Sequence, residues 1–142
     1  MNYFNLSEFC ITPDPIPQDV ADKILQNFII PLNPIRHEMG MPIIISKKSG
    51  WRPEWWEKLK DRSGDSQHVF KGMGAADLVC DDMKLLGSNL AYKSPFMRLV
   101  YYPKKRFFHV DYALGTRGYY IDMSDGDGFK RTTLELFLKK IK

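Results

Sequence analysis

The sequence predicts an α+β fold built on a small, mainly antiparallel sheet, and two patterns support this prediction. Short segments rich in β-branched and aromatic residues recur at 42–46, 75–79, 96–102, 107–113 and 117–123, which is typical of strands. Segments with apolar residues at helical spacing precede, interrupt and follow them. Three strands in succession, with helices packed on the sheet, fit an α+β fold.

The first element is a helix that follows an extended, proline-rich lead-in at 13–17. Apolar residues at 20, 21, 24, 25, 28 and 29 lie on one helix face. Pro17 suits the first turn, where no amide donor is needed. Pro31 and Pro34 are expected to break or kink this helix, and Gly40 to end its continuation.

The remaining elements follow from turn residues and apolar spacing. Residues 42–46 predict a short buried strand, and 48–50 predict a turn. A short helix is expected at 53–60, and a polar loop at 62–74. The predicted elements after this loop are a strand at 75–79, a helix at 81–90, strands at 96–102, 107–113 and 117–123, and a closing helix at 132–141.

Length and composition indicate a single domain, which we expect to span residues 1–142. The chain has 142 residues, of which 44% are hydrophobic, and no apolar run reaches the roughly 18 residues of a membrane span. The N-terminus lacks a basic segment followed by an apolar run, so we expect no signal peptide and synthesis in the cytoplasm. Cys10 and Cys80 are too few for a disulfide framework and are expected to be free thiols.

Residues 107–111, FFHVD, contain a candidate site. Alternate side chains of a strand share a face, so His109 and Asp111 should point one way while Phe108 and Val110 point into the core. An imidazole and a carboxylate on one rigid face suit a metal site. A surface strand with a chance His-x-Asp would have the same pattern.

Residues 66–77, SQHVFKGMGAAD, contain a second candidate site. His68 lies in a polar loop and Asp77 on a strand that enters the core, and Gly72 and Gly74 allow the loop to turn so that both side chains converge. A buried carboxylate needs a partner such as a metal ion. The alternative is a turn aspartate beside a solvent-exposed histidine. Two imidazoles and one carboxylate form a three-ligand zinc site that leaves a fourth position for water.

Three motifs occur in order: SGWR at 49–52, SQH at 66–68 followed by GxGAAD at 72–77, and FHVD at 108–111. Together they resemble the zinc peptidases of the hedgehog/D-Ala-D-Ala peptidase superfamily. The opening FNLSEF at 4–9 and the segment 31–52 resemble its phage-type D-Ala-D-Ala carboxypeptidase-like branch. The resemblance covers the chain from about Phe4 to Tyr112.

This resemblance implies a hedgehog/DD-peptidase-like fold and cleavage of peptide bonds in peptidoglycan stems. The resemblance also implies that His68, Asp77 and His109 bind Zn²⁺. Arg52 matches the arginine that grips substrate or shapes the cleft, a role suited to a guanidinium because it can hold a carboxylate through two parallel hydrogen bonds. The alternative for Arg52 is a surface arginine that caps the following turn.

The spacing of the ligands departs from the family pattern. In the family the aspartate is the seventh residue after the histidine, whereas Asp77 is the ninth residue after His68. The seventh residue is Ala75, which cannot bind zinc. We therefore expect Asp77 to be the ligand, with the extra residues bulging out between Gly72 and Gly74.

The catalytic base departs from the pattern as well. Many carboxypeptidase relatives have a carboxylate three residues before the last histidine, where this chain has Arg106, which is always protonated. Asp111 is the best substitute because it shares a strand face with His109. Asp111 could equally orient a histidine ligand, and Asp61 and Asp65 are weaker candidates for the base.

The leading prediction is a zinc metallopeptidase that hydrolyses peptidoglycan stem peptides or cross-links, released in the manner of phage enzymes or delivered to the cell wall by a virion. The alternative is a catalytically inactive wall-binding or virion structural module on the same fold. Basic residues at 104–106, 130–131 and 139–142 could attract a polyanion or form a solvated face, and the net charge of +4 does not distinguish the two. No nucleic-acid partner is expected, because a strand already explains segment 101–112. The oligomeric state is not determined by the sequence, and a monomer is the default expectation.

Overall fold

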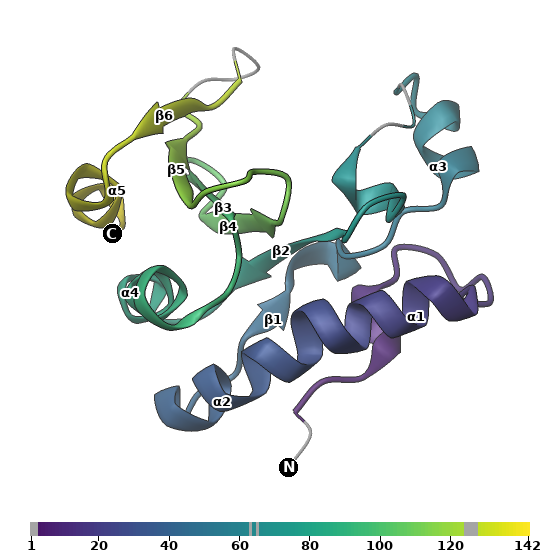
Figure 1. Ribbon diagram of the computed structural model, residues 1–142, viewed down its shortest axis with the longest axis horizontal. Coiled ribbons are helices and arrows are strands. Elements are labelled where there is room, and N and C mark those ends of the chain that lie inside the picture. The colour runs from purple at the N-terminus through teal and green to yellow at the C-terminus, as the bar shows by residue number, and fades with distance from the viewer. Residues whose placement is uncertain (1–2, 63, 65, 124–127) are drawn as a thin grey trace.

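A computed structural model describes residues 3–62, 64, 66–123 and 128–142. It contains a six-stranded sheet with the strand order β1-β2-β4-β3-β5-β6 (Figure 1). Neighbouring strands are antiparallel except for β3 and β5, which are parallel. The predicted α+β class and mainly antiparallel sheet are therefore confirmed. The strands are β1 (Ile44–Ile45), β2 (Ala75–Val79), β3 (Arg98–Tyr102), β4 (Phe107–Asp111), β5 (Gly118–Ile121) and β6 (Lys130–Thr132).

The N-terminal helix is not broken at its prolines and continues to the residue before Gly40. It runs through α1 (Gln18–Ile24), a π-helical turn η2 (Leu25–Ile29) and α2 (Ile30–Met39) without a break. Pro31 and Pro34 therefore do not end it, and the wide π turn comes directly before them, which is a common way to accommodate irregular backbone hydrogen bonding in a helix. Gly40 adopts φ 68° and ends the helix as expected.

The predicted helices at 53–60, 81–90 and 132–141 are confirmed as α3 (Glu54–Leu59), α4 (Met83–Lys93) and α5 (Leu134–Lys140). Three short 3-10 helices were not predicted: η1 (Leu6–Phe9), η3 (Ser46–Lys48) and η4 (Gln67–Val69). Strand β1 is shorter than predicted, and it is buried on one face only: Ile43 and Ile45 belong to the core, whereas Ile44 between them is 53% exposed. Strand β6 was not predicted, since two of its three residues are cationic and show no apolar alternation.

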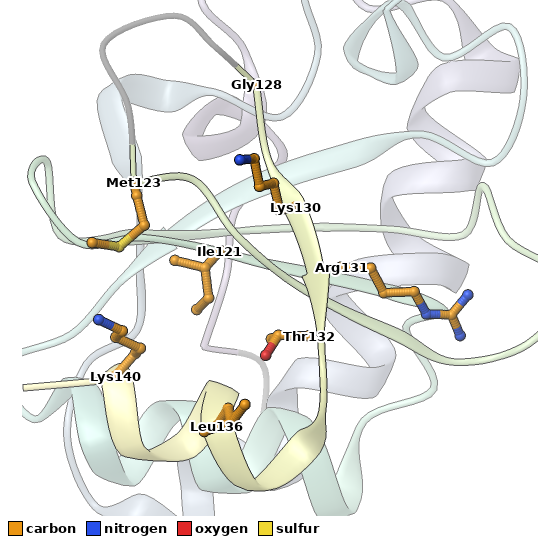
Figure 2. Close-up of a pocket in the computed structure, with 8 residues that line it drawn as sticks. All are labelled: Ile121, Met123, Gly128, Lys130, Arg131, Thr132, Leu136 and Lys140. Carbon is orange, nitrogen blue, oxygen red and sulfur yellow. The ribbon is translucent and has the colours of Figure 1, made fainter.

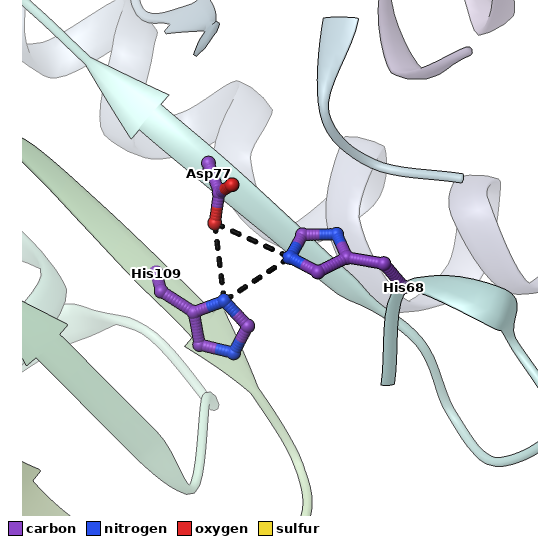
Figure 3. Close-up of side chains that lie close together, drawn as sticks. All are labelled: His68, Asp77 and His109. Atoms are coloured by element: carbon purple, nitrogen blue, oxygen red, sulfur yellow. Dashed lines mark hydrogen bonds and ion pairs between the residues drawn. The ribbon is translucent and has the colours of Figure 1, made fainter. Parts of the chain in front are cut away.

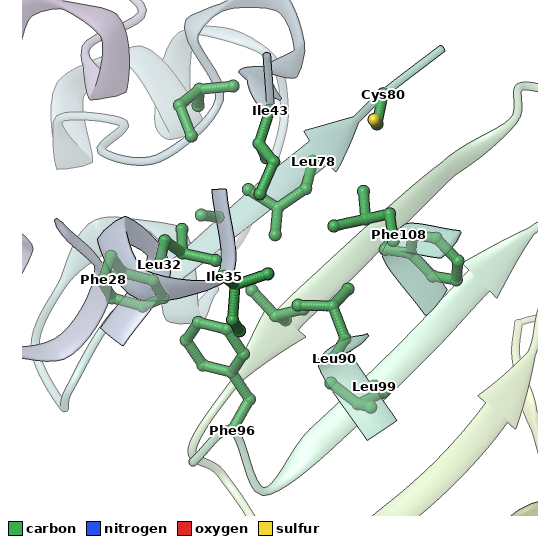
Figure 4. Close-up of a cluster of buried hydrophobic side chains, with 14 of the residues drawn as sticks. Phe28, Leu32, Ile35, Ile43, Leu78, Cys80, Leu90, Phe96, Leu99 and Phe108 are labelled. Carbon is green, nitrogen blue, oxygen red and sulfur yellow. The ribbon is translucent and has the colours of Figure 1, made fainter. Parts of the chain in front are cut away.

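The core lies between one face of the sheet and the helices α1, α2 and α4 (Figure 4). Each central strand contributes alternate residues to it, as a pleated strand must. These inward residues are Ala76 and Leu78 on β2, Leu99 and Tyr101 on β3, and Phe108 and Val110 on β4. The residues between them are therefore presented on the opposite face, where the candidate site lies.

Cys10 and Cys80 are both buried free thiols, as predicted. Neither thiol belongs to the group of candidate metal donors. Among the described segments, no helix has the length and apolar character that crossing a bilayer requires.

Candidate metal centre

Three side chains from separate elements meet on the open face of the sheet. Asp77 on β2 lies opposite His109 on β4 in the antiparallel register. His68 comes from η4, just before β2, and its ring reaches the same point (Figure 3). The structure thus brings together the three residues that the sequence predicts as metal ligands.

The potential ligand atoms form a compact triangle. His68 Nε2 lies 3.2 Å from His109 Nδ1 and 3.4 Å from Asp77 Oδ1. His109 Nδ1 lies 3.0 Å from Asp77 Oδ1. Bond lengths of about 2.1 Å in a tetrahedral zinc site separate the ligand atoms by about 3.4 Å. The triangle therefore has the size that one metal ion requires, and the group can hold such an ion.

Each histidine ring is held through its second nitrogen. His68 Nδ1 lies 2.9 Å from the carbonyl oxygen of Gly50, which can only accept, so Nδ1 carries the proton and Nε2 presents its lone pair to the triangle. His109 Nε2 lies 2.6 Å from Asp111 Oδ2, so Nε2 is the donor and Nδ1 faces the triangle. Hydrogen bonds of this kind fix the tautomer and ring orientation of metal-binding histidines.

Asp111 is completely buried and contacts the His109 nitrogen that faces away from the other two donors. Arg98 lies opposite Asp111 in the register of β3 and β4 and donates to Oδ2 from Nε at 2.9 Å and from Nη2 at 2.5 Å. The backbone amide of Ala113 donates to Oδ1 at 2.9 Å. The carboxylate is therefore held from three directions.

Burial and charge set the protonation states of the site. Burial lowers the pKa of His68, so this ring is neutral near pH 7. Burial disfavours the charged form of Asp77, but the two imidazoles outweigh it and hold the pKa of this carboxyl well below its usual value. Burial also disfavours protonation of His109, but hydrogen bonds to Asp111 and Asp77 raise its pKa to about 9. Without metal, His109 is a cation between two carboxylates, and metal binding would displace its Nδ1 proton.

Arg52 lies beside the triangle on the Asp77 side. Its Nη2 donates to Ser49 Oγ at 2.6 Å and lies 3.5 Å from Asp77 Oδ2. Its guanidinium carbon lies 5.8 Å from the centre of the Trp56 ring. Only 18% of the side chain is exposed, so Arg52 is a fixed cation at the edge of the site and not a free surface residue.

A cavity of about 380 Å³ borders the triangle. Besides the three potential ligands, its described lining consists of Arg52, Ser66, Gln67, Arg98, Tyr102, Phe107 and Phe129. Burial raises the pKa of Tyr102 to about 12, so its phenol is neutral and can donate a hydrogen bond. Asp77 is the only carboxylate among these described lining residues, and Asp111 is not one of them.

The other acidic candidates do not border the cavity as far as the structure describes them. Asp61 is exposed in the turn after α3, and Asp65 lies outside the described residues. Arg106, three residues before His109, is exposed and donates from Nη2 to the backbone oxygen of Lys142 at 2.8 Å. Position 106 is therefore engaged at the C-terminus and not at the triangle.

The long spacing between His68 and Asp77 is accommodated by two left-handed residues. Phe70 adopts φ 64° and Gly74 adopts φ 97°. A Cβ atom on Gly74 would lie 2.1 Å from the Phe70 ring, so only glycine fits against this ring. Gly72, also expected to shape the loop, does not have a positive φ.

Arg98 and Tyr102, which belong to none of the sequence motifs, line the same cavity. Their signal is the alternation along β3, where Leu99 and Tyr101 are buried. This alternation places Arg98 and Tyr102 on the face that carries His109. The strand prediction alone could therefore have located them.

A different cavity of about 360 Å³ lies where β5 and β6 meet α5 (Figure 2). Apolar side chains and cations line it, including Ile121, Met123, Leu136, Lys130 and Lys140. No described residue of its lining offers an imidazole, a thiol or a carboxylate, which are the side chains that bind transition metals. The candidate metal centre is therefore the triangle on the sheet.

No family model, curated protein or solved structure matches this chain. The resemblance to zinc peptidoglycan peptidases therefore stays a prediction.

Proposed function

We propose that this protein is a zinc-dependent peptidase with a hedgehog/DD-peptidase-like fold that hydrolyses amide bonds in peptidoglycan stem peptides or cross-links. The observation that carries the proposal is the triangle of two imidazole nitrogens and one carboxylate oxygen bordering a cavity. Catalytic zinc sites have three protein ligands and an open position. The substrate class comes from the motif resemblance.

The donor set favours zinc over the hard cations. Calcium and magnesium are bound by oxygen ligands, whereas two of the three donors here are imidazole nitrogens. His68, Asp77 and His109 would hold the ion. When bound, zinc lowers the pKa of a coordinated water to about 7 and polarises a carbonyl.

The remaining side chains have roles that follow from their positions. Arg52 is a fixed cation beside Asp77 and can stabilise negative charge that develops on a substrate. The neutral phenol of Tyr102 borders the same cavity and can donate to a substrate oxygen. Asp111 orients His109 and favours its Nδ1 as the ligand, which supports the orienting alternative over the base.

One observation favours the inactive alternative, a wall-binding or virion structural module. A hydrolase of this kind needs a group that moves the proton from the nucleophilic water to the leaving amine. Among the described residues of the cavity, Asp77 is the only carboxylate. If no other group fulfils this role, the site would bind zinc and wall peptides without turnover.

The experiment combines metal content with hydrolysis. Atomic emission should find one zinc per chain, chelation should abolish release of peptides from purified peptidoglycan, and added zinc should restore it. His68→Ala should lose both zinc and activity. His37→Ala is the matched control, since His37 is exposed and contacts Tyr3 far from the site.

Two results would contradict the proposal. Turnover by His68→Ala at the wild-type rate would show that the triangle is not the active site. Bound zinc without cleavage of any stem peptide would instead support the binding module.

A further inference from the structure

Besides the cavity that borders the triangle, a second cavity, of about 530 Å³, adjoins the candidate metal centre. It shares Arg52, Asp77 and Phe107 with the cavity over the triangle. The two cavities are therefore neighbours, and these three residues border both of them. A peptide seated at the triangle would extend into the second cavity.

Cations dominate the wall of this second cavity. Lys47, Arg52, Arg62 and Lys105 line it, and Asp77 is the only acidic residue in its described lining. Asp77 already faces the two imidazoles. An excess of like charge in a concave site raises the local concentration of the opposite ion, so the cavity should attract anions.

Part of this positive charge is held in place by the fold. Glu57 is 1% exposed and pairs with Arg62 at 3.0 Å, which fixes the guanidinium. Arg62 and Arg52 lie 5.1 Å and 5.8 Å from the centre of the Trp56 ring, which also lines the cavity. The ring gives the two cations a common apolar support.

The loop that presents Lys47 is strained. Lys47 and Lys48 adopt φ values of 50° and 54°, a left-handed conformation that is uncommon for residues other than glycine. The hydrogen bond from the Ser49 amide to the Ser46 carbonyl, at 2.8 Å, closes the turn around them. Strained backbone of this kind concentrates at ligand-binding sites. Lys105 approaches the same cavity from the turn between β3 and β4.

We infer that the second cavity is a carboxylate-binding subsite, in which Lys47 and Lys105 receive a free carboxylate of the substrate close to the scissile amide. This inference rests on the proposed function and narrows its substrate class to acidic peptides. Exposed lysine ammonium groups act as point charges with three donors, which suits a carboxylate whose orientation is set elsewhere. Arg62 is already paired with Glu57, so it contributes positive potential to the cavity and is not expected to bind the carboxylate directly.

The test uses the zinc-loaded protein and a synthetic stem tetrapeptide, L-Ala-γ-D-Glu-L-Lys-D-Ala. Two further versions have the D-Glu α-carboxylate or the terminal carboxylate converted to the amide. Calorimetry measures Kd, and mass spectrometry checks that the peptide stays intact. For a peptide that is cleaved, KM replaces Kd.

Amidation of one of the two carboxylates should weaken binding about tenfold, and the sensitive position identifies which carboxylate enters the subsite. Lys47→Ala and Lys105→Ala should each weaken binding of the acidic peptide about fivefold. Neither variant should change the affinity for the peptide amidated at this sensitive position by more than about twofold. Higher salt should reduce the difference between acid and amide, because exposed charges are screened.

Two controls separate charge from structure. Lys47→Arg should retain the preference for the acid. Lys84→Ala should bind like the wild type, because Lys84 is an exposed lysine on α4, at the core side of the sheet. Equal affinity for the acid and both amides would overturn the inference. So would Lys47→Ala and Lys105→Ala variants that weaken binding of the acid and of the amide by the same factor.

The outcome also separates this inference from the proposed function. Cleavage without any preference for a carboxylate would overturn the subsite and leave the peptidase. Charge-dependent binding that Lys47→Ala and Lys105→Ala each weaken as expected, without cleavage, would support the subsite and contradict the peptidase.

Discussion

Asp111→Asn tests whether this buried carboxylate orients a metal ligand. In the wild type, Asp111 Oδ2 accepts from His109 Nε2 at 2.6 Å and from Arg98 Nε at 2.9 Å. Asparagine has the same size, but it is uncharged and cannot neutralise Arg98. Its amide can present either a donor or an acceptor to His109 Nε2, so it no longer fixes the tautomer in which Nε2 carries the proton and Nδ1 is free to bind metal. Loss of such a partner costs about 10–100-fold in metal affinity, or about 1.4–2.8 kcal/mol.

The assay is competition for zinc with a chromophoric chelator, combined with urea unfolding of the metal-free protein. Removing one partner of a buried ion pair costs about 3–5 kcal/mol. Since the Arg98 side chain is 20% exposed, water compensates part of this, and we expect about 2 kcal/mol. Arg98→Gln is the matched control. It breaks the same pair but leaves the carboxylate on His109, so stability should fall while zinc affinity stays within about threefold.

An Asp111→Asn protein that binds zinc as tightly as the wild type would contradict the orienting role of Asp111. If that protein had also lost turnover, Asp111 would be the catalytic base. A fall in zinc affinity that Arg98→Gln reproduces in full would mean that the effect comes from general destabilisation.

The affinity of the metal-free protein for zinc should rise with pH up to about 9, because zinc must displace a proton from His109. Burial disfavours this proton, but the hydrogen bonds of His109 to Asp111 and Asp77 outweigh burial and raise its pKa to about 9. Each unit below this pKa should weaken binding about tenfold, and a flat calorimetric profile from pH 6.5 to 9 would contradict it. The same raised pKa stabilises the metal-free fold below pH 6.5, and this contribution should be lost as the pH rises through about 9. Gly74→Ala should destabilise the protein by about 2–4 kcal/mol in urea unfolding, because φ is 97° and the new Cβ would lie 2.1 Å from the Phe70 ring. Gly115→Ala, with no atom within 4 Å of the new Cβ, should stay within about 0.5 kcal/mol of the wild type, and equal effects of the two would disprove the argument. Arg52→Lys should lower kcat/KM about 10–100-fold while zinc affinity stays within about threefold, and a parallel loss of zinc would show that Arg52 acts through the ligands.

Much of the sheet was predictable because local pattern and tertiary packing agree there. The strands at 75–79 and 107–111 were predicted from their composition, and the alternation in 107–111 also predicted the face of each side chain of β4. The uninterrupted N-terminal helix was not predictable, since a proline in a helix costs about 3 kcal/mol. Phe28, Leu32 and Ile35 are almost fully buried against the sheet, and burial of about 2 kcal/mol each offsets that cost.

The sequence by itself determined the donor types and the strand faces on which two of them lie, because residue identity and a period of two are local properties. Only the tertiary structure decided which nitrogen of each imidazole faces the triangle. Gly50, from a separate segment, holds Nδ1 of His68, and Arg98 on β3 fixes the Asp111 carboxylate that holds Nε2 of His109. It also decided that Lys47 and Lys105 share one cavity beside Asp77. Such contacts join residues far apart in the chain, and the register and packing that create them have no periodic signature in the sequence.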